Sequence, residues 1–310
     1  MWSVIECTGH PRDLGSGQGL AVGNAIRQQV EKNGLAARRR RWPKLAAFTS
    51  GPIRGSGSGR EMIRHFTHLA ERADGLARGA GVPVDSLLEL QDPAYSEADE
   101  AQAACALHAG DGTGSNLLRT LAGGSWLVRR SRPEVGFASL ELTEPWCVSA
   151  VAGINEAGLA VCMAPSGEVA SLGGSAASSQ FFVQECLQRF EEIEAGIDWC
   201  LNRPVKGQGT LLLGDAEGRL GAVHFEAEAP TPERSEGSPI LAGLPGPAMK
   251  AFESWSASPA AGRVPLAGSP MIRLDCGERR LELRDGSSSE RILALDVALS
   301  DRSEPAGLAS

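Results

Sequence analysis

The chain has 310 residues, 42% of them hydrophobic and 22% charged, an ordinary composition for a globular protein with a sizeable core. Its net charge of −8 at pH 7 argues against non-specific nucleic-acid binding, since phosphate contacts need a basic surface. No apolar run approaches the roughly 18 residues of a membrane span and no signal peptide is readable at the N-terminus, so no membrane location is expected.

The seven cysteines are odd in number and scattered, and most lie inside apolar runs. This usage is typical of reduced, buried thiols rather than of a disulfide framework. We therefore expect a cytoplasmic protein. Aromatic residues make up only 5% of the chain, so close packing of small residues has to replace aromatic bulk.

The first hundred residues are expected to form a mostly helical, leader-like region of a single domain spanning 1–310. A short strand at 3–8 is followed by a Gly-rich turn at 10–19 and a helix at 20–37. Gly15, Gly17 and Gly19 suggest a phosphate cradle, but no dinucleotide fingerprint or P-loop Lys-Ser/Thr follows them. We prefer the interpretation that these glycines allow close helix packing.

Residues 61–79 have the spacing of an amphipathic helix, and residues 83–90 predict a second one. His65 and His68 lie one turn apart on the first helix, yet no third ligand accompanies them at a convincing spacing. No metal and no cofactor are therefore expected. The basic run at 38–41 is interpreted as a helix end in solvent.

The core is predicted at 101–300, where short apolar strands are separated by turn residues. Strands are expected at 103–108, 116–122, 126–133, 137–143, 148–152 and 158–163, then a helix at 178–196, a hairpin at 210–226, an exposed loop at 227–242, and strands at 271–275, 280–284 and 292–299. Hairpins with helices grouped between them favour an α+β sandwich of two mainly antiparallel sheets over a parallel βαβ fold.

Five stretches, taken in order, resemble the acyl-coenzyme A:6-aminopenicillanic acid acyltransferase family of N-terminal-nucleophile hydrolases. They are residues 11–19, 71–83, 117–122, 151–160 and 212–218. The resemblance implies a four-layer αββα sandwich. It also implies the family's chemistry, in which the chain cuts itself to free an N-terminal Cys. That Cys attacks amide or thioester carbonyls, with its own α-amine as the base.

The position of the nucleophile depends on how the first core strand is aligned with the family. Matching the inward apolar positions with Cys105 and Leu107 places Gln102 at the nucleophile position, and Gln is no nucleophile. The same register places Ala122 where the family has an Asp. A joint loss of catalytic groups indicates a catalytically degenerate member.

A shifted alignment of the first core strand with the family makes Cys105 the nucleophile, freed by cleavage after Ala104. In that register Ala106 replaces the usual hydroxyl residue, and the Asp is still missing at Ala122. A buried core thiol is the competing interpretation of Cys105. The other candidates for catalytic groups are Arg119, the retained polar residue of the second strand, and Asn155, in the best-kept family turn.

Two hypotheses follow. The protein is a non-catalytic member that binds a small acyl or peptidic ligand or a partner, or it is an active cysteine amidohydrolase or acyltransferase that uses Cys105. A third idea is that Arg119, together with Arg129 and Arg130, holds a carboxylate ligand. A homo-oligomer is compatible with the sequence, which does not specify the substrate.

Overall fold

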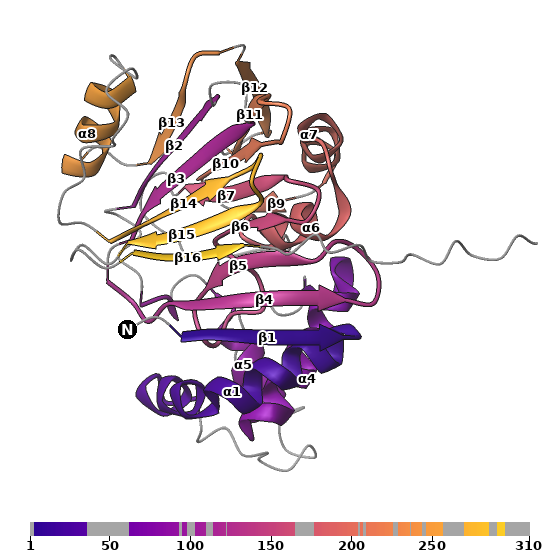
Figure 1. Ribbon diagram of the computed structural model, residues 1–310. Helices are drawn as coiled ribbons and strands as arrows, with labels where there is room; N and C mark the ends of the chain where they lie inside the picture. The colour runs from indigo at the N-terminus through magenta and orange to yellow at the C-terminus, as the bar shows by residue number, and fades with distance from the viewer. Residues whose placement is uncertain are drawn as a thin grey trace, which may run out of the picture.

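The computed structural model describes residues 3–35, 62–92, 95–97, 103–109, 114–121, 123–164, 177–203, 205–206, 209–225, 229–235, 237–243, 246–256, 270–284 and 290–294. These residues form an α+β sandwich with two large, mainly antiparallel sheets (Figure 1). The predicted fold class is confirmed by the strand pairing itself. No helix in the described ranges has the length and apolarity to cross a membrane.

The larger sheet has eight strands in the order β1-β4-β5-β6-β7-β10-β11-β12. Its strands are β1 (Ser3–Gly9), β4 (Leu127–Pro133), β5 (Ser139–Thr143), β6 (Ala152–Asn155), β7 (Ala160–Ala164), β10 (Gly209–Gly214), β11 (Leu220–Phe225) and β12 (Thr231–Ser235). All of its pairings are antiparallel except that of β1 with β4, which brings the start of the chain alongside residues 127–133.

The smaller sheet has six strands in the order β13-β2-β3-β14-β15-β16. They are β2 (Ala104–Ala109), β3 (Ser115–Thr120), β13 (Ile240–Gly243), β14 (Met271–Asp275), β15 (Arg280–Arg284) and β16 (Glu290–Ala294). A parallel pair of two-residue strands, β8 (Ala177–Ser178) and β9 (Val205–Lys206), stands apart from both sheets.

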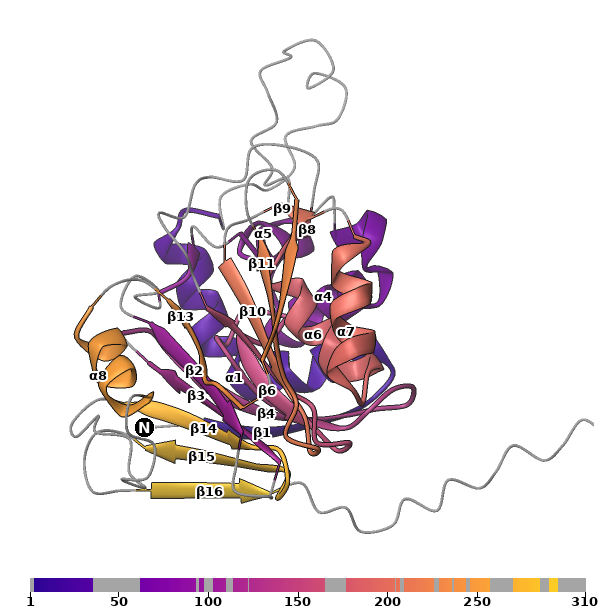
Figure 2. The same cartoon turned by 90° about the horizontal axis from the view of Figure 1, so that it is seen from above.

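Helices cover the outer faces of the two sheets. Figure 2 shows most of them along one side of the larger sheet, with strands β14 to β16 on its other side. The helices are α1 (Pro11–Lys32), α4 (Thr67–Ala80), α5 (Val84–Glu89), α6 (Phe181–Arg189), α7 (Ile193–Leu201) and, against the smaller sheet, α8 (Pro247–Ser256). The result is the four-layer αββα order.

Side chains alternate between separate hydrophobic cores. In β10, Leu211 and Leu213 pack under the helices, whereas Leu212 enters the core between the sheets. In β2, Cys105 lies in the core between the sheets, whereas Ala104 packs in the core that includes Phe252 of α8. The central strands are therefore covered on both faces, as their continuous apolar runs predicted.

Some predicted elements were wrong. The strand expected at 148–152 lies later in the chain, as β6 at Ala152–Asn155, and the helix expected at 61–79 is interrupted at Phe66, so that α4 begins at Thr67. The Gly-rich stretch at 10–19 is not a turn, because α1 begins at Pro11. The stretch at 227–242 is not wholly a loop, since it contains β12 and β13. The helix expected at 178–196 is two helices, which are interrupted at Phe190, where the backbone is extended. The basic run at 38–41 lies outside the described residues.

Candidate functional site

Cys105 lies at the second position of β2, and its side chain is fully buried between the two sheets. Its Sγ is 3.4 Å from Sγ of Cys162 in β7. Burial and the hydrogen bond with Cys162 raise the pKa of the Cys105 thiol well above its ordinary value, against the opposing influence of Arg119. A catalytic cysteine needs the thiolate form and access to a carbonyl, and this position offers neither.

The Ala104–Cys105 peptide, where self-cleavage would have to occur, is also buried. Ala104 is 1% exposed, and its N–H donates to Oγ1 of Thr120 at 2.8 Å. The Thr120 hydroxyl lies 3.3 Å from the Ala104 carbonyl. This peptide bond is thus part of the β2–β3 pair, inside the packed sheet.

Arg119 is directly opposite Cys105 in the β2–β3 pair and is 1% exposed. Its Nη1 lies 3.7 Å from Sγ of Cys105 and 3.8 Å from Sγ of Cys162. The same nitrogen donates to the carbonyl of Met163, so Arg119 connects β3 of the smaller sheet with β7 of the larger one. This arrangement is that of a cross-link between sheets.

Asn155 ends β6, and its side chain is fully buried. Its Nδ2 donates to the carbonyls of Leu187 at 3.0 Å and Phe190 at 2.7 Å. Its Oδ1 accepts from the N–H groups of Ala157 at 3.1 Å and Leu159 at 2.9 Å. Asn155 thereby ties the β6–β7 turn to the end of α6, and these bonds occupy the side chain within the protein.

Arg129 and Arg130 are neighbours in β4 and point to different surroundings. Arg129 is fully buried and donates to Glu141 at 2.5 Å, Gln18 at 2.6 Å and Gln184 at 3.0 Å. Arg130 is partly exposed and donates to the carbonyl of Ala294 at 3.1 Å. The sequence did not indicate the network around Glu141, because its members are far apart along the chain and belong to different elements.

Gln102 and Ala122, the residues at the family's nucleophile and Asp positions, lie outside the described residues. The chain next to Ala122 borders a cavity of about 530 Å³, lined by Leu121, Gly123 and Trp126 among others. Val22 of α1 and Pro145 contribute to the same wall. The cavity is therefore lined mainly by apolar and small residues and lies beside the end of β3.

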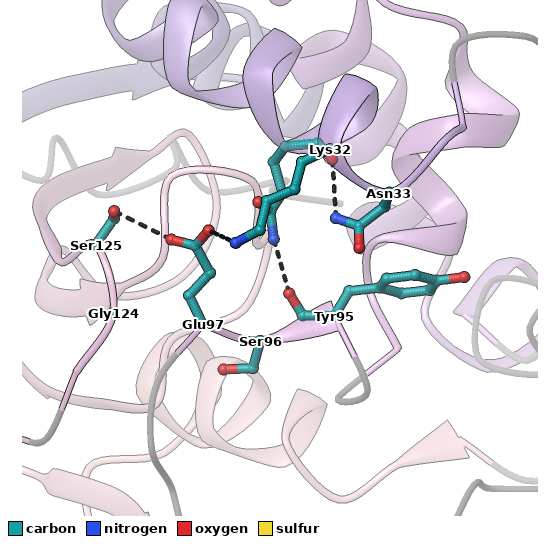
Figure 3. A pocket seen from close by; sticks show the side chains of 8 residues that line it. Lys32, Asn33, Tyr95, Ser96, Glu97, Gly124 and Ser125 are labelled. Atoms are coloured by element: carbon teal, nitrogen blue, oxygen red, sulfur yellow. Dashed lines mark hydrogen bonds and ion pairs between the residues drawn. The ribbon is translucent and has the colours of Figure 1, made fainter.

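A second cavity, of about 450 Å³, shares Gly124 and Ser125 with the first and is polar. Lys32 reaches into it from the last turn of α1 and pairs with Glu97 at 2.6 Å (Figure 3). The hydroxyl of Ser125 donates to the other Glu97 oxygen at 3.3 Å. The two cavities adjoin at these shared residues, and the pair, with its more apolar and its charged section, is here called the Trp126 groove.

His65 and His68 are not part of a metal site in the described ranges, where no three metal-ligating side chains come together. His68 pairs with Glu185 of α6 at 2.5 Å instead. This contact joins α4 to α6.

No family model matches the sequence, and no curated protein matches it. A solved structure of penicillin V acylase from Agrobacterium tumefaciens has a similar arrangement, with 12% sequence identity, a TM-score of 0.39 and coverage of 61% of this chain and 84% of the other. A mutant of conjugated bile acid hydrolase from Clostridium perfringens matches with 8% identity, a TM-score of 0.44 and coverage of 63% of this chain and 92% of the other. The Caenorhabditis elegans N-acylethanolamine-hydrolyzing acid amidase ortholog matches with 10% identity, a TM-score of 0.43 and coverage of 61% of this chain and 99% of the other. Identities and scores of this size assign neither a family nor an activity.

Proposed function

We propose that the protein is a non-catalytic member of the N-terminal-nucleophile hydrolase-like group and that it binds a small acyl or peptidic ligand in the Trp126 groove. The observation that carries the proposal is the position of Cys105, whose fully buried Sγ packs against Cys162 and Arg119. A carbonyl carbon cannot reach that sulfur without separation of the two sheets.

The groove has the two sections that an amphipathic acyl compound requires. Leu121, Trp126 and Pro145 offer an apolar wall for a short chain. Lys32, Glu97 and Ser125 offer charged and hydrogen-bonding groups for an amide or carboxylate head. An N-acylated amino acid combines both features in one molecule.

Mass spectrometry tests the non-catalytic part. We expect a single unprocessed chain under denaturing conditions and no labelling of Cys105 by iodoacetamide until the protein is unfolded. Two pieces, the second beginning at Cys105, would overturn the proposal. Hydrolysis of an acyl-p-nitroanilide that Cys105→Ala abolishes would also favour the active cysteine enzyme.

Calorimetric titration with N-octanoylglycine tests the binding part. Trp126→Ala should weaken binding by about tenfold, because the half-buried indole forms much of the apolar wall. Val84→Ala is the matched control, since this exposed valine on α5 lies outside the groove. Equal affinities for the wild type and Trp126→Ala would exclude the groove as the site.

A further inference from the structure

A third cavity, of about 540 Å³, lies at the N-terminal end of α1, whereas the Trp126 groove follows the later turns of that helix. It is bounded by the first turns of α1 and α4, the turn after β4 and the end of α6. The exposed Val135 gives it an apolar rim, the buried Leu14 and Leu69 lie beneath it, and Arg72 borders it from α4. None of its lining residues contributes to the Trp126 groove, so the two sites are separate.

Arg72 is 1% exposed, and its guanidinium is only partly satisfied. Nη2 donates to Oγ of Ser131 at 3.1 Å and lies 3.6 Å from Oε2 of Glu141. Nε and Nη1 are buried and have no hydrogen-bond partner. Buried donors are nearly always paired, so two unpaired nitrogens in a residue that borders a cavity point to a missing acceptor. Because both atoms have almost no accessible surface, an acceptor in the cavity reaches them only when the side chains that cover Arg72 shift.

The buried charges around Arg72 do not balance. Arg129 and Arg72 are both buried beside the single carboxylate of Glu141, which Arg129 contacts at 2.5 Å. Burial, reinforced by the charge of Arg129, lowers the pKa of Arg72 to about 10, so Arg72 stays cationic at neutral pH. Among the described residues Glu141 is the carboxylate that pairs with both arginines, and since it can neutralise only one of them, one buried positive charge is left over in this part of the chain.

The cavity also limits the kind of anion. Its apolar walls favour a ligand with an aliphatic chain. Glu71 and Glu134 stand among its lining residues together with Arg189 and Arg72, so the lining carries little net charge and favours a singly charged ligand over a doubly charged phosphate. A single carboxylate on a short chain satisfies both conditions and offers oxygen acceptors to a guanidinium.

We propose that this cavity binds a short aliphatic carboxylate, whose carboxylate group pairs with Arg72 after the side chains covering the guanidinium shift, while its chain packs beside Val135 and over Leu14 and Leu69. The ligand supplies the negative charge that the buried arginines lack. The site is independent of the Trp126 groove and of whether the protein is an enzyme.

Isothermal titration of the full chain with hexanoate, compared with hexan-1-ol, tests the charge requirement. Hexanoate should bind saturably, and the alcohol at least about tenfold more weakly, because a hydrogen bond to a charged group is worth about 1.5–3 kcal/mol. Equal affinity for the two probes, or no saturable hexanoate binding at millimolar concentration, would overturn the proposal.

Variants locate the site. Arg72→Met should lower hexanoate affinity by at least about tenfold. If that variant does not fold, Val135→Asp decides, since Val135 is 88% exposed and the substitution places a negative charge at the cavity mouth. Val84→Asp is the control for an added surface charge and should bind as the wild type does. Binding that Trp126→Ala abolishes and Val135→Asp leaves unchanged would place hexanoate in the Trp126 groove and refute the assignment.

Discussion

The α1–α4 contact depends on glycines that face backbone atoms of the opposite helix. A Cβ atom on Gly75 would lie 1.9 Å from the carbonyl oxygen of Arg12, and one on Gly15 would lie 2.0 Å from that of Arg72. Because both obstacles are backbone, the helices have to separate by more than about 1 Å. Overpacking of this kind lowers the free energy of unfolding by about 3 kcal/mol, occasionally more. The higher helix propensity of alanine offsets about 1 kcal/mol of this loss. We expect Gly75→Ala to lower the free energy of unfolding by about 2–3 kcal/mol.

Gly17 provides a matched control on the same helix. A Cβ atom there would meet Sγ of Cys7 at 3.7 Å, which is an ordinary contact, so Gly17→Ala should stabilise the protein by up to about 1 kcal/mol. Urea unfolding followed by circular dichroism measures both variants. The double variant Gly15→Ala with Gly75→Ala should lose less than the sum of the single losses, because one helix separation relieves both clashes. A Gly75→Ala protein as stable as the wild type would refute the reasoning.

Three further predictions concern buried and exposed polar contacts. Asn155→Ala removes four hydrogen bonds and should cost about 2–4 kcal/mol in urea unfolding, whereas a loss below about 1 kcal/mol would contradict its anchoring role. Burial raises the pKa of Glu141, but Arg129 and Arg72 outweigh it and hold that pKa at about 2, below the ordinary 4.5. Its stabilisation of about 3 kcal/mol is therefore present above pH 4.5 and lost as the pH falls towards 2, and unfolding midpoints that stay constant over this window would disprove it. Lys32→Ala should change stability by less than about 1 kcal/mol, because its ion pair with Glu97 is largely exposed; a larger loss by thermal unfolding would show a stronger contact.

The sequence predicted the strands well where apolar runs are bounded by turns. The hairpin at 210–226 and the strands at 271–275 and 280–284 occur within a residue or two of the expected positions. The stretch at 10–19 was mispredicted because its glycines have poor helix propensity on their own. They are helical because Gly75 and Gly79 on α4 allow the two backbones to approach. Close helix packing is what the glycines of this stretch predicted, although the helix itself was not expected to begin before residue 20.

The candidate sites were less accessible to sequence reasoning. The sequence leaves two interpretations of Cys105, and only the fold places it against Cys162, which is 57 residues away in the chain. Arg72 lies in a helix of polar and small residues, where an arginine normally faces solvent. Its burial follows from the packing of α4 over the larger sheet, where the side chain reaches Ser131 of β4 and Glu141 of β5.

The parallel pairing of β1 with β4 has a consequence for how the chain could be divided. Residues 3–9 form one edge of a sheet whose other strands all come from the chain after residue 126. Two side chains of the first hundred residues also contact β4, since Gln18 accepts a hydrogen bond from Arg129 and Arg72 donates one to Ser131. Separately produced fragments 1–97 and 103–310 should consequently find each other and assemble, so that a split anywhere between them can serve as a complementation reporter.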